Sequence, residues 1–145
     1  MRSVKRTAIV PYRAGEMFDL VNDVEAYEEF LPWCSRSEVL AADGDSVKAT
    51  IELRHGAISR SFTTRNTLTK GAAIDIGLIG GPFRQLRGGW RFDPLGDDGC
   101  RVSLELEFEF ESRAVDLLFG RFFEQTCNSL VDAFTARAEA VYGQR

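Results

Sequence analysis

The sequence is poor in the residue types that most often perform catalysis or hold metal ions. Its 145 residues include a single histidine, His55, and the three cysteines Cys34, Cys100 and Cys127 lie far apart without a Cys-x-x-Cys pair. This spacing argues against a zinc site and against a disulfide framework. The motifs of serine hydrolases, zinc peptidases, phosphate-binding loops and dinucleotide-binding folds are absent as well. We therefore expect a protein that is not an enzyme and needs no metal ion or catalytic cofactor.

Long apolar runs are also missing. No window approaches the roughly 18 apolar residues of a membrane-spanning helix, and residues 1–6 contain no apolar stretch of the kind that a signal peptide needs. The formal charge of −4 provides no general attraction to nucleic acid. We expect a cytoplasmic protein without a DNA partner.

Lysine is scarce, since only three of the 18 basic residues are lysines and the others are arginines. The planar fork of arginine suits contacts with carboxylate or phosphate better than an ammonium group does. A local basic face is therefore compatible with the negative total charge. Its candidates are five arginines on two nearby predicted strands, Arg60, Arg65, Arg84, Arg87 and Arg91. The alternative is that these side chains are ordinary solvated surface.

The hydropathy pattern predicts one domain over residues 1–145, with strands between two helical regions. Residues 3–10 alternate between apolar and polar side chains before Pro11, which predicts a first strand. Residues 14–22 and 24–31 place apolar side chains at helical spacing and predict two short helices. Period-two alternation between turn residues then predicts six strands at 34–41, 46–54, 58–69, 72–79, 83–93 and 100–111.

Residues 113–142 predict one long helix, with Ser112 as its N-cap and Gly143 at its end. Its apolar stripe includes Leu117 and Phe123 and covers about 240° of the helix, which is wider than one sheet face. This order predicts an α+β fold in which a curved antiparallel sheet of about seven strands surrounds the helix. The wide first half of the helix then needs a second partner, either the short helices or a bound molecule.

Polar residues at inward positions of the strand 58–69 suggest a site. If Ile58 and Phe62 face the core, then Arg60, Thr64 and Asn66 share that side. Buried polar groups need hydrogen-bond partners. These three residues therefore either bond within the protein or supply the few polar contacts of an apolar pocket.

Other features have structural interpretations. His55 stands beside Gly56 in a predicted turn, which favours a solvated side chain. Gly88 and Gly89 predict a bulge that bends the sheet, and Cys34 predicts a small buried residue. The alternating acidic residues of the strand 100–111 predict a face that points to water.

Several separate motifs resemble the START-like family of coenzyme Q-binding proteins. They are, in order, Asn22 to Tyr27, Phe30 to Cys34, Phe62 to Asn66, Gly81 to Phe83, Gly89 to Phe92, Phe108 to Phe110 and Phe119 to Arg121. The likeness runs from about residue 3 to residue 142 and so covers nearly the whole chain. The fold of that family is the helix-grip fold, also called START/Bet v 1-like. In it a hydrophobic tunnel runs between a curved sheet and a long C-terminal helix.

The resemblance implies a non-enzymatic carrier or chaperone for ubiquinone, or a related polyisoprenoid lipid, that supports respiration. An isoprenoid tail needs a long apolar tube, and a quinone head needs one or two hydrogen-bond donors. Such a protein would exchange its ligand by transient contact at the periphery of the inner membrane. The implied lining is Phe30, Leu31, Trp33, Trp90, Phe92, Leu106, Phe108, Phe119, Phe122 and Phe123, with Arg60, Thr64 and Asn66 as polar candidates. The alternative for each residue is a plain core position.

The family also includes bacterial ribosome association toxins, which implies a second function. In that case the protein would bind the large ribosomal subunit and block its joining to the small subunit. The RNA phosphates would be contacted by Arg60, Arg65, Arg84, Arg87 and Arg91. A cyclase or aromatase on the same fold is a third interpretation, for which the sequence offers no acid–base pair.

Overall fold

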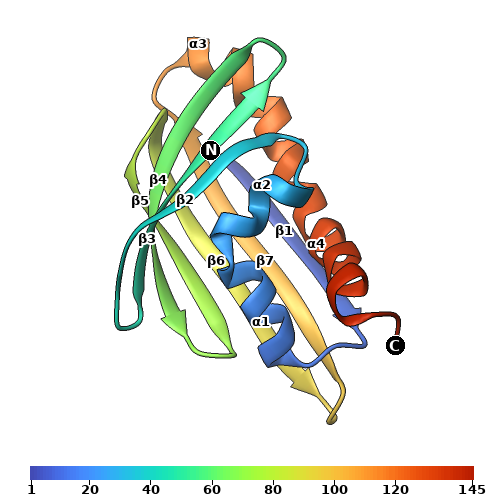
Figure 1. Cartoon of the computed structure of the whole chain (residues 1–145). Coiled ribbons are helices and arrows are strands. Elements are labelled where there is room, and N and C mark those ends of the chain that lie inside the picture. The colour runs from blue at the N-terminus through green and yellow to red at the C-terminus, as the bar shows by residue number, and fades with distance from the viewer.

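A seven-stranded antiparallel sheet curves around one long C-terminal helix in the computed structural model, which describes all 145 residues (Figure 1). The strands are β1 Arg2–Val10, β2 Cys34–Asp43, β3 Ser46–His55, β4 Ile58–Thr69, β5 Ala73–Gly80, β6 Phe83–Leu95 and β7 Gly99–Phe110. Their order is β1-β7-β6-β5-β4-β3-β2, so β2 to β7 pair consecutively and β1 joins the edge beside β7. The predicted α+β helix-grip fold is confirmed.

The helices occupy two places in the chain. The first group follows β1 and comprises α1 Ala14–Asn22, the 3₁₀ turn η1 Val24–Ala26 and α2 Tyr27–Phe30. The second group follows β7 and comprises α3 Arg113–Val115, η2 Asp116–Gly120 and α4 Arg121–Tyr142. Figure 1 shows α1 and α2 on the same side of the sheet as α4. None of the helices combines the length and the apolar character that crossing a membrane requires.

The alternation along β7 separates core from solvent as predicted. Leu104 and Phe108 are completely buried against the helix side, whereas Glu105 and Glu107 are exposed on the other face. Because the side chains of a strand alternate with a period of two, one residue type on each face is enough to orient the whole strand.

The predicted bulge at Gly88 and Gly89 is wrong. The pairing of β6 with β7 runs without interruption from Leu86 to Leu95, and the irregularity lies earlier, just after Phe83. Gly88 instead has a φ of 146°, and a Cβ atom there would lie 2.0 Å from the carbonyl oxygen of Glu105. Glycine is needed at this position because the backbone of the neighbouring strand occupies the space of a side chain.

The C-terminal helix differs from the single regular helix that the sequence predicts. Ser112 caps it, since its Oγ accepts a hydrogen bond from the backbone N–H of Val115 over 3.2 Å. The next turn, η2, is a π-helical turn that interrupts the α-helical phase. Leu117 and Leu118 are 79% and 50% exposed, so the prediction that Leu117 joins the buried stripe is wrong. Phe119 after them is buried.

Candidate functional site

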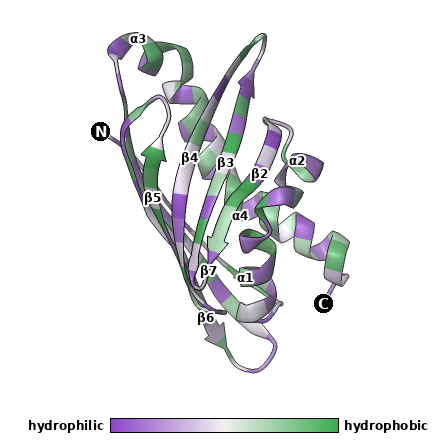
Figure 2. Ribbon diagram, turned by 60° about the vertical axis from the view of Figure 1, so that its left-hand side comes forward, coloured by the Kyte–Doolittle hydropathy of each residue, from purple (hydrophilic) through white to green (hydrophobic).

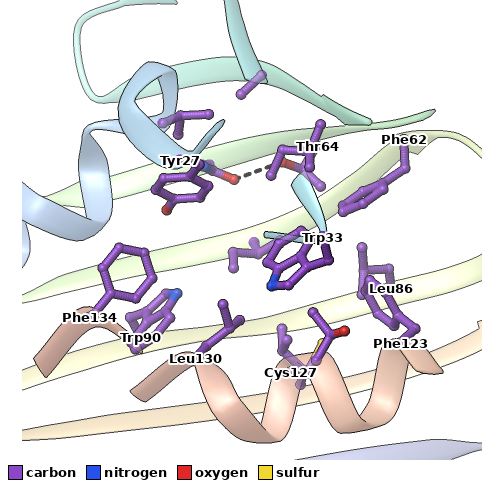
Figure 3. A pocket seen from close by; sticks show the side chains of 17 residues that line it. Tyr27, Trp33, Phe62, Thr64, Leu86, Trp90, Phe123, Cys127, Leu130 and Phe134 are labelled. Atoms are coloured by element: carbon purple, nitrogen blue, oxygen red, sulfur yellow. Dashed lines mark hydrogen bonds between the residues drawn. The ribbon is translucent and has the colours of Figure 1, made fainter. Parts of the chain in front are cut away.

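An apolar cavity lies between the sheet and α4, with η1 and α2 at one side. Fourteen of its seventeen lining residues are hydrophobic, and Figure 3 shows their side chains converging from both layers. The helical and connecting segments contribute Val24, Tyr27, Trp33, Phe123, Thr126, Cys127, Leu130 and Phe134, and the strands contribute Ala49, Ile51, Phe62, Thr64, Asn66, Ile76, Leu86, Trp90 and Leu106. The sheet curves around α4, and the side chains of the two layers leave part of the space between them unfilled (Figure 1).

Six of the thirteen residues implied by the family resemblance line this cavity. They come from the α2–β2 connection, β4, β6, β7 and α4, and they are Trp33, Thr64, Asn66, Trp90, Leu106 and Phe123. Residues that are distant in the sequence thus meet on one surface. Two of the three polar candidates, Thr64 and Asn66, are among them.

The remaining seven residues lie outside the lining, and four of these belong to the core or its rim. Phe92 packs edge-on against Phe18 of α1, with ring centroids 6.0 Å apart. Phe108 lies behind Phe123, 4.8 Å away, and therefore supports the wall without facing the cavity. Phe30 packs against Phe134, and Leu31 is buried beside it in the chain.

The other three residues gather where the β3–β4 hairpin meets the start of α4. The ring of Phe122 stacks on His55 at 4.1 Å, and the exposed Arg60 guanidinium lies 5.8 Å from the centre of the Phe119 ring. The alternation of the strand predicted that Arg60 faces the pocket, but Arg60 is not part of the cavity lining. The hairpin extends beyond the cavity, however, and a side chain near its tip reaches the end of the molecule instead.

Eleven lining residues were not predicted as ligand contacts. They are Val24, Tyr27, Ala49, Ile51, Phe62, Ile76, Leu86, Thr126, Cys127, Leu130 and Phe134. Some carried a usable signal, because Cys127, Leu130 and Phe134 follow Phe123 at helical spacing and so share its face. No pattern within β3 or β5 distinguishes a cavity wall from ordinary core.

The polar groups of the cavity are mainly free hydrogen-bond donors. Thr64 Oγ1 donates to Asn66 Oδ1 over 3.0 Å, which occupies that acceptor and leaves the Asn66 amide N–H groups available. The indole N–H groups of Trp33 and Trp90 have no acceptor within the protein. The Tyr27 hydroxyl is not free, since it donates to the carbonyl oxygen of Val21, and burial raises its pKa. Such a site suits an apolar molecule that carries acceptor atoms such as carbonyl oxygens.

The cavity is small in this conformation, with about 80 Å³ of free space. An apolar cavity of about 150 Å³ is the size that takes up benzene. A ligand larger than that can enter only if a wall moves. Trp33 is half-buried and is the lining residue that lies outside any helix or strand, between α2 and β2. Its carbonyl oxygen accepts one backbone hydrogen bond, from the N–H of Arg54 over 2.9 Å.

Three of the arginines predicted to form a basic face are paired with carboxylates across the outer face of the sheet. Arg91 contacts Asp75 at 2.7 Å, and Arg87 contacts Glu107 at 3.1 Å. Arg84 approaches Glu109 at 3.8 Å, while Arg65 donates to the hydroxyl of Ser46. The outer face is therefore of mixed charge. No cluster of histidine, cysteine, aspartate or glutamate side chains could hold a metal ion.

Comparison with known proteins agrees with this geometry. Residues 10–135 match the family model for polyketide cyclase / dehydrase and lipid transport proteins. The chain is 47% identical over 144 residues to the ribosome association toxin RatA of Vibrio cholerae, covering 99% of this chain and 100% of that protein. It is 27% identical to the mitochondrial coenzyme Q-binding protein COQ10 homolog B of Xenopus laevis, covering 94% of this chain and 58% of that protein.

A solved structure shows the same fold. A START superfamily protein from Mycobacterium smegmatis superposes with a TM-score of 0.77 at 24% identity, covering 96% of this chain and 98% of that one. The resemblance to START-like proteins is thus confirmed by sequence and by architecture. The chain belongs to the polyketide cyclase / dehydrase and lipid transport family, with a START-like fold.

Proposed function

We propose that this protein binds ubiquinone, or a related polyisoprenoid lipid, in the cavity between the sheet and α4 and carries it in support of respiration. Binding rather than turnover is the activity. The observation that carries the proposal is an apolar cavity whose free polar groups are all able to donate, namely the Asn66 amide, the Trp33 and Trp90 indoles and the Thr126 hydroxyl. A quinone matches it with an apolar tail and two carbonyl acceptors. The distant likeness to a coenzyme Q-binding protein supports the same ligand class.

Loading requires the cavity to widen, because 80 Å³ is less than a quinone ring occupies. We expect Trp33 to swing outward, since it joins two elements without belonging to either. The apolar tail would lie between α4 and the strands, against the hydrophobic lining. A polyisoprenoid ligand dissolves in membranes, so the natural source for loading is a lipid bilayer.

Extraction with organic solvent, followed by mass spectrometry, tests the proposal on protein purified natively from a ubiquinone-producing host. We expect near-stoichiometric ubiquinone in the unaltered protein and much less in a Leu106→Trp variant purified in parallel. Leu106 lines the cavity, so the larger ring fills it. Protein without quinone, or a random lipid mixture that is the same in both samples, would contradict the proposal.

A second candidate function is association with the large ribosomal subunit and inhibition of subunit joining. The observation that favours it is the name of two relatives, from Escherichia coli and Vibrio cholerae, which are 43% and 47% identical over at least 99% of this chain and are called ribosome association toxins. Among the predicted contacts, Arg60 and Arg65 have no carboxylate partner, while Arg84, Arg87 and Arg91 would exchange one for an RNA phosphate. This exchange makes the outer face a weaker RNA-binding surface than its arginine count suggests.

Sedimentation with large ribosomal subunits over a series of salt concentrations tests this second function. Phosphate contacts predict binding that weakens steeply as salt rises. The double variant Arg60→Gln, Arg65→Gln should bind less and show a shallower salt dependence. Unchanged binding across the salt series would exclude the arginine–phosphate mechanism.

A further inference from the structure

One end of the molecule combines exposed aliphatic side chains with arginines that have no carboxylate partner. The tip of the β3–β4 hairpin and the segment α3–η2 form this end, as Figures 1 and 2 both show at the top of the view. We name it the end surface, and define it by Ile58, Arg60, Arg113, Leu117, Leu118 and Arg121.

The two halves of the end surface are held together by direct contacts. His55 at the end of β3 stacks on Phe122 of α4 at 4.1 Å, and Arg60 lies over the ring of Phe119. Arg2 anchors η2 from the other side, through paired contacts of 3.0 and 3.1 Å with Asp116. These contacts hold the β3–β4 hairpin and the segment α3–η2 in a fixed position relative to each other.

Its leucines have no function within the fold. Leu117 is 79% exposed and Leu118 is 50% exposed, although their neighbour Phe119 is buried. At about 100° per residue, both leucines lie about 100° or more around the helix axis from Phe119 and Phe123, which face the core. Exposed aliphatic side chains that lie next to one another, with basic residues around them, are typical of surfaces that insert into the interface of a bilayer.

The charges around the leucines favour an anionic partner. Ten of the 18 basic residues of the chain form ion pairs, but Arg60, Arg113 and Arg121 do not. Nearby acidic groups reduce the positive charge only in part. Asp116 and Glu124 share the single charge of Arg2, Glu52 keeps its charge because only a serine hydroxyl donates to it, and Glu111 at the end of β7 is exposed and opposes the arginines.

We propose that the end surface docks the protein on anionic lipid membranes, with Leu117 and Leu118 inserted and the arginines at the headgroups. An RNA partner would also bind the arginines, but its phosphates would make no apolar contact with the two exposed leucines. A membrane uses both features. The docked position also brings the bilayer close to the cavity. Phe122 stacks on His55 at the end surface, and the next residue, Phe123, lines the cavity. A role in ligand loading rests on the proposed function, whereas docking itself does not.

Flotation with lipid vesicles tests the docking. We expect binding to vesicles that contain phosphatidylglycerol, little binding to pure phosphatidylcholine, and weaker binding at high salt. The double variant Leu117→Ser, Leu118→Ser and the double variant Arg113→Gln, Arg121→Gln should each lower the affinity at least about tenfold. The matched controls are Leu95→Ser and Arg101→Gln, which change an exposed leucine and an unpaired arginine near the opposite end and should bind as the unaltered protein does.

Three outcomes would overturn the proposal: no binding to phosphatidylglycerol vesicles, equal loss in the control variants, or loss in the arginine variant alone together with loss of binding to large ribosomal subunits. The last result would assign the surface to RNA.

Measuring quinone uptake from detergent separates docking from the proposed function. If the leucine variant loads from detergent but not from vesicles, docking serves loading. If the unaltered protein docks and never takes up quinone from detergent, the proposed function fails and docking stands.

Discussion

The Thr64 hydroxyl donates a hydrogen bond of 3.0 Å to Asn66 Oδ1, two residues along the same strand. Both side chains line the cavity, and the bond fixes the Asn66 amide so that its N–H groups remain for a ligand. The polar part of the site is therefore oriented by the protein before any ligand arrives, which reduces the entropy lost on binding.

Replacement of Asn66 by leucine should weaken quinone binding about tenfold, because a donor to a carbonyl oxygen is lost. The matched control is Thr64→Val, which removes the internal bond but leaves the amide in place and should lower the affinity less. Quenching of Trp33 and Trp90 fluorescence, both in the cavity wall, measures the binding. An equal loss of quinone affinity in both variants would show that the Asn66 amide donates no hydrogen bond to the ligand.

The variant Leu106→Trp should lose quinone binding and keep its fold. The leucine is almost completely buried in the cavity wall, so an indole there occupies the free space, at a cost of about 1–3 kcal/mol in stability from overpacking. Leu95→Trp, on an exposed position near the β6–β7 turn, is the control for the substitution itself. Titration with quinone in detergent and thermal unfolding are the two measurements. Full binding by the Leu106 variant would place the ligand elsewhere.

Gly88→Ala should destabilise the protein by at least about 3 kcal/mol, or prevent folding, because the added Cβ meets the carbonyl oxygen of Glu105 at a positive φ. Gly80→Ala is the control, since nothing lies within 4 Å of a Cβ at that position. Urea unfolding of the two variants provides the comparison. A Gly88 variant as stable as the control would mean that β6 and β7 can separate without cost.

Asp116→Asn should make stability less dependent on pH below neutrality. The hydrogen bond from Arg2 holds the pKa of the Asp116 carboxyl below its ordinary value, so the pair stabilises the folded state above about pH 4 and this contribution disappears as the pH falls through the lowered pKa. Both side chains are about one third exposed, which limits the effect to about 1 kcal/mol.

Urea unfolding of the Asp116 variant and the unaltered protein between pH 7 and pH 3 measures this effect. The two free energies should converge on acidification. Asp132→Asn breaks a longer and more exposed ion pair with Arg6 and should change stability little at any pH. A constant difference between the Asp116 variant and the unaltered protein would assign the effect to packing.

The three cysteines should react slowly with thiol reagents at pH 8. Burial raises the pKa of the Cys100 thiol to about 11 and raises the pKa values of Cys34 and Cys127 as well, so almost no reactive thiolate is present. All three should react quickly in urea. Cys127 lines the cavity, so in a Cys34→Ala, Cys100→Ala variant its slow labelling reports cavity opening, and bound quinone should slow it further. Fast labelling of the folded protein would mean that the cavity is open most of the time.

The strands and helices could be predicted from the sequence because their patterns are local. Alternation in 100–111 orients β7, and Pro11, Ser112 and Gly143 mark the ends of elements, Ser112 through its side-chain hydroxyl and the other two through their backbone geometry. The family resemblance depended on motifs spread along the chain, and it supplied the tunnel that periodicity alone could only suggest.

The tertiary structure decided which apolar residues face a cavity and which fill the core. Phe108 and Leu106 share a strand face, yet Leu106 lines the cavity and Phe108 lies behind Phe123. That difference arises from how the curved sheet packs against α4, which no single segment encodes. Leu117 likewise belongs to the wide apolar stripe but is 79% exposed, because only the side of the helix that carries Phe119 and Phe123 packs against the core. Local periodicity determined the elements, and the distances between elements determined the site.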